Sequence, residues 1–143
     1  MNGDLKHRAL TNKIIGTFYE VYNELGFGFL ESVYENSLVI ALTESGFNVE
    51  QQISVPVWFR GQRVGNFVAD LLVENTVILE LKAARAIDEA HKAQLLNYLR
   101  ATEIEIGLLL NFGKSAEFKR LAFDNDRKKQ AAIQKSTIEN LLS

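Results

Sequence analysis

The sequence predicts an α/β fold in which helices flank a single sheet, and three observations lead to this prediction. Apolar residues recur at three- and four-residue spacings in two early segments, as they do in amphipathic helices. Three strand-like runs separated by turn signals follow these segments. A further helical segment then precedes a continuous apolar run from Ile106 to Phe112, which is typical of a fully buried strand. This order of elements indicates one layer of strands covered by helices.

The first helix is expected over residues 5–24, where apolar residues fall at helical spacing. Gly26 follows and is well placed as a C-terminal cap, because glycine readily adopts the left-handed conformation that ends many helices. A second helix is expected from about Leu30 to Ser45, and Gly46 stops it. Both helices therefore precede the strands along the chain.

Three strand-like runs come next, and short polar or glycine-containing turns separate them. Their alternation is imperfect, which is usual for strands that are covered on both faces. The expected strands cover residues 48–59, 64–73 and 77–83. The turn between the second and third runs is Glu74-Asn75-Thr76.

A third helix is expected at about residues 87–102, with Asp88 and Glu89 in its first turn, where carboxylates suit the positive end of the helix dipole. After the buried strand, residues 118–123 are a candidate edge strand. The length of 143 residues fits one domain, which we expect to cover residues 1–123. A charged tail, weakly helical in its pattern, occupies residues 124–143.

Composition narrows the possible chemistry of the protein. A hydrophobic fraction of 47% with 24% charged residues excludes a disordered chain. Because there is no cysteine, thiolate metal sites and thiol nucleophiles are excluded, and any metal would be held mainly by oxygen ligands. A net charge of −2 excludes nucleic-acid binding by bulk electrostatics and leaves a local positive groove open. The N-terminal residues contain no apolar signal core, and no apolar run approaches membrane-span length, so a cytoplasmic location is expected.

An unusual set of charged residues lies on the second and third strands. If the three residues 74–76 form the turn of a hairpin, Asp70 faces Glu80 and Lys82 lies on the same face of the sheet. A two-residue turn would shift the register by one and direct Asp70 to the opposite face from Glu80. The register of this hairpin is therefore a direct test of the site.

Two neighbouring carboxylates repel each other, and a divalent cation would offset this repulsion better than a lysine alone. Asp70 and Glu80 on a hard cation, with Lys82 close by, suit phosphodiester hydrolysis. The structural alternative is an ion pair between Lys82 and one of the carboxylates at the end of the sheet.

Three motifs of the sequence resemble those of a known superfamily and occur along the chain in the same order as in that superfamily. Asp70 followed by Glu80-Leu81-Lys82 resembles the D…(D/E)-x-K signature of the PD-(D/E)XK nuclease superfamily. The segment from Gly28 to Tyr34 matches the G-x-x-E-x-x-Y motif that names the GxxExxY protein family. The segment from Gln94 to Tyr98 matches the Q-x-x-x-Y motif of RecB-like nucleases. The likeness extends from about residue 8 to residue 123.

The resemblance implies a restriction-endonuclease-like fold with an αβββαβ core around a mixed sheet. It also implies site residues of three kinds: a catalytic set, a metal-binding set and a supporting or substrate-binding set. These are Asp70, Glu80 and Lys82 for catalysis, Glu31, Asp70 and Glu80 for Mg²⁺ or Mn²⁺, and Gln94, Tyr98 and Tyr34 for support.

Several of these residue types also have a purely structural interpretation. An isolated tyrosine is usually a core aromatic with its hydroxyl at the surface, and a lone histidine such as His91 is usually structural. Trp58 could stack on a base, but a half-buried strand tryptophan is the stronger expectation.

The leading hypothesis is a metal-dependent nuclease that hydrolyses phosphodiester bonds of DNA, with RNA as the other substrate considered. The alternative is a catalytically silent module that keeps the nuclease fold for nucleic-acid binding or protein assembly. A homodimer is compatible with both, because the apolar run at residues 106–112 or the final helical segment could offer a contact surface.

Overall fold

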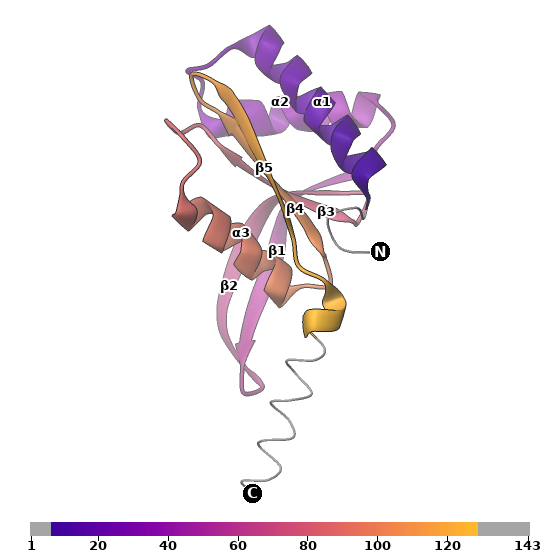
Figure 1. Ribbon diagram of the computed structural model, residues 1–143, viewed down its shortest axis with the longest axis vertical. Coiled ribbons are helices and arrows are strands. Elements are labelled where there is room, and N and C mark those ends of the chain that lie inside the picture. Colours follow the sequence, from indigo (N-terminus) through magenta and orange to yellow (C-terminus); the bar gives the residue numbers. More distant parts are fainter. Residues whose placement is uncertain (1–6, 129–143) are drawn as a thin grey trace, which may run out of the picture.

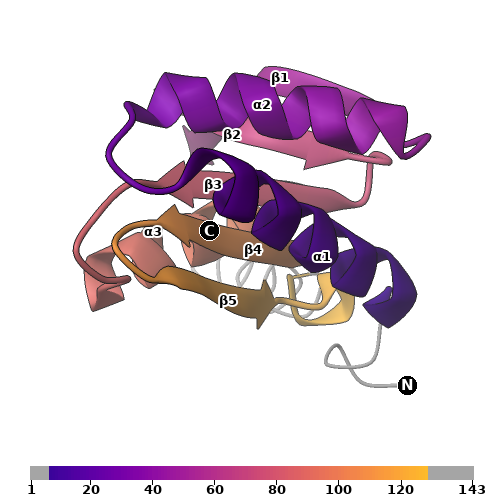
Figure 2. The ribbon, with the colours of Figure 1, turned by 90° about the horizontal axis from the view of Figure 1, so that it is seen from above.

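The computed structural model describes residues 7–128 and contains a five-stranded mixed sheet between two layers of helices. The strand order is β1-β2-β3-β4-β5, with α1 and α2 on one face and α3 on the other (Figure 1, Figure 2). The elements are α1 (Arg8–Leu25), α2 (Glu31–Glu44), β1 (Val49–Phe59), β2 (Gln62–Val73), β3 (Val77–Lys82), α3 (Glu89–Ala101), β4 (Ile106–Phe112) and β5 (Ala116–Ala122). This architecture confirms the predicted α/β fold with a mixed sheet flanked by helices.

The strands pair antiparallel except for β3 and β4, which are parallel and are joined by α3. A parallel pair needs such a crossover, because a tight turn can only reverse the chain. In β4 every residue is buried, as the continuous apolar run predicted. The crossover places α3 across the sheet from α1 and α2, and so encloses the central strands on both sides.

Two strand boundaries differ from the prediction. Strand β2 begins at Gln62 instead of residue 64, because Arg60 and Gly61 both have positive φ and form a two-residue turn that keeps the ladder intact to the tip. Strand β5 begins at Ala116, since it pairs with β4 from the first residue after a tight loop. The sequence alternation marked the middle of each strand but not where pairing starts.

Two apolar cores lie on the two faces of the sheet. One joins α1 and α2 to the sheet and contains Phe18, Tyr34 and Phe112, whose rings contact one another. The other joins α3 to the sheet through Leu95 and Leu99. Helix α3 approaches β4 closely at Gly107, where a Cβ atom would lie 2.8 Å from the Leu95 side chain.

The β1–β2 hairpin is longer than the sheet that supports it. Strand β1 pairs with β2 from Val49 to Phe59, whereas β3 pairs only with the last residues of β2. Beyond that point the hairpin continues alone beside α3 (Figure 1). We call residues 53–69 the hairpin arm.

The beginning of the predicted tail packs against the end of α3. Residues 125–128 form a helical turn, and the Lys128 ammonium donates to the carbonyls of Thr102 and Ile104, each at 2.9 Å. The predicted tail beyond residue 128 lies outside the described residues. Within the part of the chain that the structure describes, no helix is long and apolar enough to cross a membrane.

Candidate functional site

The predicted site lies where strands β2 and β3 separate. Near their turn the strands form a regular antiparallel ladder that pairs Leu71 with Leu79, Leu72 with Ile78 and Val73 with Val77. This register confirms the three-residue turn and excludes the two-residue alternative. The ladder ends before Asp70 and Glu80, so these two residues, expected to face each other, do not pair through their backbones.

Asp70 and Glu80 replace the missing backbone ladder with their side chains. The Asp70 N–H donates to Glu80 Oε1 at 3.0 Å, and the Leu81 N–H donates to Asp70 Oδ2 at 2.8 Å. Each carboxylate is therefore held by the backbone of the facing strand. This reciprocal arrangement, which we call the carboxylate pair, fixes both groups side by side.

Burial and mutual repulsion make the carboxylate pair electrostatically costly. Glu80 is 4% exposed, and its pKa is raised to about 8, first by burial and then by the negative charge of Asp70. The pKa of half-buried Asp70 is also raised by burial, although its hydrogen bond from Leu81 acts in the opposite direction. Positive charge near the pair is therefore too small to offset its desolvation.

Lys82, the last residue of β3, supplies part of that positive charge. Its ammonium acts to lower the pKa of both Asp70 and Glu80, so it lies near the pair. Within residues 7–128, however, Lys82 forms no ion pair with either carboxylate. The structural alternative of a closed ion pair at the end of the sheet is therefore not what the structure contains.

Glu31, expected as a third acidic ligand, is the exposed first residue of α2. Its charge contributes to the raised pKa of Asp70, but it is the weakest of the causes. Among the described residues, no group of three or more histidine, aspartate or glutamate side chains gathers closely enough to hold a metal ion. The structure thus brings Asp70 and Glu80 together and leaves Glu31 nearby, outside a common coordination sphere.

Glu35, one turn after Glu31, is a neighbour of the site that the sequence analysis missed. Its carboxylate accepts from Gln51 Nε2 at 2.9 Å and from Gln52 Nε2 at 3.0 Å, and its charge raises the pKa of both members of the carboxylate pair. Gln52 has a positive φ of 54° within β1, a strained conformation of the kind that occurs at functional sites. The four-residue spacing of the two glutamates on one helix was the available signal.

Helix α3 supplies a tyrosine and a glutamine beside the carboxylate pair. Gln94 Nε2 donates to the Tyr98 hydroxyl at 3.1 Å. The pKa of Tyr98 is raised by burial and then by the charges of Glu80 and Asp70, so the phenol lies within electrostatic reach of both. The structure therefore places Gln94 and Tyr98 together near the carboxylate pair, and their role at the site stays a prediction from the sequence.

Tyr34 and His91 have structural contacts. Tyr34 is fully buried, and its hydroxyl donates to the Gly26 carbonyl at 2.6 Å and accepts from the Phe29 N–H at 3.2 Å. In this conformation Tyr34 can support the loop before Glu31 but cannot touch a substrate. His91 forms a capping box with Asp88 at the start of α3.

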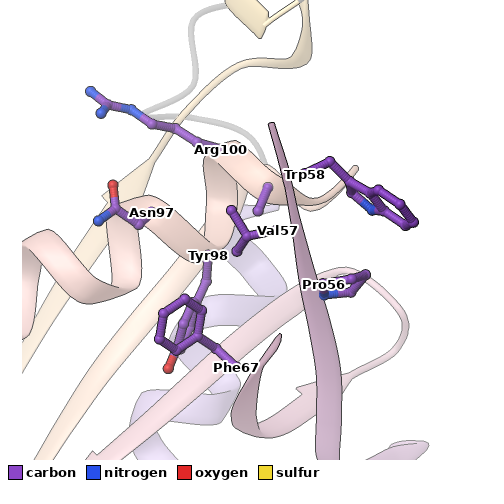
Figure 3. Close-up of a pocket in the computed structure, with 8 residues that line it drawn as sticks. Pro56, Val57, Trp58, Phe67, Asn97, Tyr98 and Arg100 are labelled. Carbon is purple, nitrogen blue, oxygen red and sulfur yellow. The ribbon is translucent and has the colours of Figure 1, made fainter. Parts of the chain in front are cut away.

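The expectation that Trp58 is half-buried is wrong, because its side chain is 61% exposed. The register of β1 and β2 shifts between Val57 and Trp58, and the arm at this point has no third strand beside it. Trp58 is one of the residues that line a pocket between the hairpin arm and α3, and its ring lies on the other side of β1 from Phe67 and Tyr98 (Figure 3).

Comparisons with known proteins give a family match and a similar fold. A family model described as the PD-(D/E)XK nuclease superfamily matches residues 8–121. The crystal structure of a protein named SSO0001 is similar in fold, with a TM-score of 0.52 and 18% identity. That match covers 76% of this chain and 58% of the other, so this chain spans less than two thirds of its length.

An alkaline exonuclease from Laribacter hongkongensis, LHK-Exo, also matches, with a TM-score of 0.48 and 12% identity over 95% of this chain and 84% of that one. Among proteins with curated descriptions, none matches the sequence.

Proposed function

This chain belongs to the PD-(D/E)XK nuclease superfamily, and from that membership we propose that it is a metal-dependent nuclease that hydrolyses phosphodiester bonds. DNA is the leading substrate, and RNA is the second. The observation that carries the proposal is the carboxylate pair, in which Asp70 and Glu80 lie side by side with raised pKa values close to Lys82. Carboxylates whose pKa values are raised by burial and by a neighbouring like charge cluster at functional sites.

The donor chemistry of the pair suits a hard divalent cation. Mg²⁺ and Mn²⁺ prefer carboxylate oxygens, and a dication would relieve the repulsion that raises the pKa of Glu80. We assign Asp70 and Glu80 as its protein ligands and Glu31 as a third acidic group that completes the site. When bound, the cation would supply Lewis acidity toward a phosphoryl oxygen and a nearby water.

The other residues of the site act on the substrate and on the pair itself. Lys82 would stabilise negative charge on the phosphate or position the attacking water. Gln94 would orient the Tyr98 hydroxyl through their hydrogen bond, and Tyr98 would line the approach to Glu80. Tyr34 would hold the loop that leads to Glu31.

The motif residues support a finer assignment. The segment from Gly28 to Tyr34 favours membership of the GxxExxY family, and the hydrogen-bonded Gln94 and Tyr98 favour a RecB-like site. A cytoplasmic location and a homodimer stay predictions from the sequence.

The second candidate function is a module that keeps the fold without turnover, for nucleic-acid binding or assembly. The observation that favours it is the position of Glu31, because no third acidic side chain joins the pair within residues 7–128. A site with two ligands would bind a cation weakly.

Cleavage of defined substrates separates the two functions. We expect the full chain with Mn²⁺ to cut single-stranded or duplex DNA, and Asp70→Asn and Lys82→Ala to lose activity by on the order of 100-fold or more. Glu44→Gln, an exposed carboxylate at the far end of α2, is the matched control and should keep full activity. No cleavage of DNA or RNA by the unmodified chain would favour the silent module.

A further inference from the structure

A pocket of about 480 Å³ lies between the hairpin arm and α3. Pro56, Trp58 and Phe67 line it from the arm, and Asn97, Tyr98 and Arg100 line it from the helix. Figure 3 shows the rings of Phe67 and Tyr98 next to each other on one side of β1, whereas the Trp58 ring lies on the other side of that strand and points away from them. The volume is in the range typical of pockets that bind small organic groups.

The aromatic side chains of the arm are unusually exposed. Trp58 is 61% exposed, Phe59 52% and Phe67 50%. Large aromatic rings gathered on one exposed hairpin mark an interaction surface more often than a free surface. These exposed rings therefore favour a partner that presents flat apolar faces to them.

Charge on the arm indicates the nature of that partner. The hairpin arm contains Arg60 and Arg63 and no aspartate or glutamate, although the whole chain has a net charge of −2. Arg100 adds a third positive charge from the α3 side of the pocket. Arg100 is the only charged residue among the described residues that line the pocket, and the arm beside it carries two further arginines, which together complement a polyanion better than a neutral partner.

The pocket shares Tyr98 with the surroundings of the carboxylate pair. The ring centroids of Phe67 and Tyr98 are 6.0 Å apart, and Tyr98 is close enough to Glu80 and Asp70 to respond to their charges. Phe67 lies three residues before Asp70 on the same strand. A chain that leaves the pocket past Tyr98 therefore arrives at the carboxylate pair.

We propose that this pocket binds an unpaired base of single-stranded nucleic acid, stacked against the exposed Phe67 ring, which the buried Tyr98 ring supports from behind, with Trp58 on the other side of β1 as a second stacking contact for the same strand. This inference rests on the proposed function, since it specifies the substrate of that site. Stacking on side chains needs bases with exposed faces, which a single strand offers and a continuous duplex does not. A second copy of this chain fits less well, because a symmetric contact would bring Arg60, Arg63 and Arg100 close to the same three residues.

Trp58 provides a direct readout, because it is the single tryptophan of the chain. We would titrate the full chain with fluorescently labelled 15-nucleotide single strands of DNA and RNA and with the blunt DNA duplex of the same sequence. EDTA would be present, so that binding is measured without cleavage. We expect tryptophan fluorescence to be quenched by single strands, which should bind on the order of 10-fold more tightly than the duplex. Comparison of the affinities for the DNA and RNA single strands shows whether the pocket prefers deoxyribose or ribose.

Variants then test the pocket itself. Trp58→Ala and Phe67→Ala should each weaken single-strand binding on the order of 10-fold, while Trp58→Phe should keep most of it. Phe67→Leu keeps apolar bulk without a ring and should also bind weakly, which separates stacking from misfolding. The matched control is Phe118→Ala, since Phe118 is an exposed aromatic on β5 at the opposite edge of the sheet.

Three results would overturn the inference: equal affinity for duplex and single strands without quenching, unchanged binding by the Phe67 variants, or a dimer in light scattering that Trp58→Ala converts to a monomer. Failure of the proposed function looks different. Quenching and Phe67-dependent binding without cleavage in Mn²⁺ would support the pocket and contradict the nuclease activity. Cleavage unaffected by the Phe67 and Trp58 variants would support the activity and contradict the pocket.

Discussion

At the scale of single residues, the raised pKa of Glu80 connects stability with the candidate chemistry. Its pKa rises from an ordinary value of 4.5 to about 8, mainly because the side chain is buried and secondarily because Asp70 is adjacent. Between these two values the folded protein binds more protons than the unfolded chain. The free energy of unfolding therefore falls as the pH rises from about 4.5 to 8.

Glu80→Gln should remove most of this dependence. The amide keeps an oxygen for the Asp70 N–H and carries no charge, so we expect the variant to gain stability at pH 8 relative to the parent, by up to roughly 5 kcal/mol. Urea unfolding in EDTA at pH 5.5 and pH 8 measures the difference. Glu44→Gln, with its exposed carboxylate, should follow the parent protein. Equal pH slopes for Glu80→Gln and the parent would contradict the assignment.

The two glutamates of α2 offer a second comparison of single residues. We expect Glu31→Gln to weaken Mn²⁺ binding at least about 10-fold. Glu35→Gln should have a smaller effect, because its carboxylate is already held by Gln51 and Gln52. Titration calorimetry at pH 8.5 measures both affinities. A larger loss in Glu35→Gln would transfer the third-ligand role to Glu35.

At the scale of elements, the packing of α3 on β4 positions the Gln94–Tyr98 pair. Leu95 lies on the same helix and is fully buried against Gly107, so a methyl group on that glycine has no room. Gly107→Ala should therefore destabilise the fold by about 1–3 kcal/mol and shift α3 away from the sheet. In contrast, Gly16→Ala meets nothing within 4 Å in the middle of α1 and should stabilise the protein by up to about 1 kcal/mol. If this packing is correct, thermal unfolding shows a lower Tm for Gly107→Ala and a higher Tm for Gly16→Ala than for the parent protein.

Some features of the helices and strands could be predicted from the sequence, and others could not. Local patterns fixed the three helices and the β2–β3 register, since the Glu74-Asn75-Thr76 turn and alternation act over a few residues. Alternation also assigned Ala69 to the same face as Leu71, yet Ala69 packs in the α3 core. The strands part at Asp70, where side chains replace backbone hydrogen bonds, and this break depends on contacts across strands.

The site residues also divide into those that local sequence patterns predict and those that depend on tertiary contacts. Asp70 and Glu80 were predictable as neighbours because one short turn connects them, whereas Glu35 meets the pair only through the packing of α2 on β1. The exposure of Trp58 was not predictable, because it depends on how far β3 extends beside the hairpin.

At the scale of the whole molecule, the two arginines of the hairpin arm lie away from the carboxylate pair. The carboxylate pair lies within the sheet, while Arg60 and Arg63 sit at the far end of the hairpin arm. A nucleic acid attracted to the arm would approach the acidic groups from one direction. The low net charge of the chain is thus compatible with a nuclease, because the relevant charges are local.

The hairpin arm adds only two fully buried residues to the core, Val55 and Ala69. Its outer part can therefore be shortened or lengthened by equal numbers of residues on the two strands. Changing two residues on each strand keeps every remaining side chain on its original face, because side chains alternate between the faces. Such changes would leave Asp70 and Glu80 in place. Under the proposed function, substrate selection by the arm and hydrolysis at the carboxylate pair would be modular, so changes in the arm could alter the bound substrate without rebuilding the reacting groups.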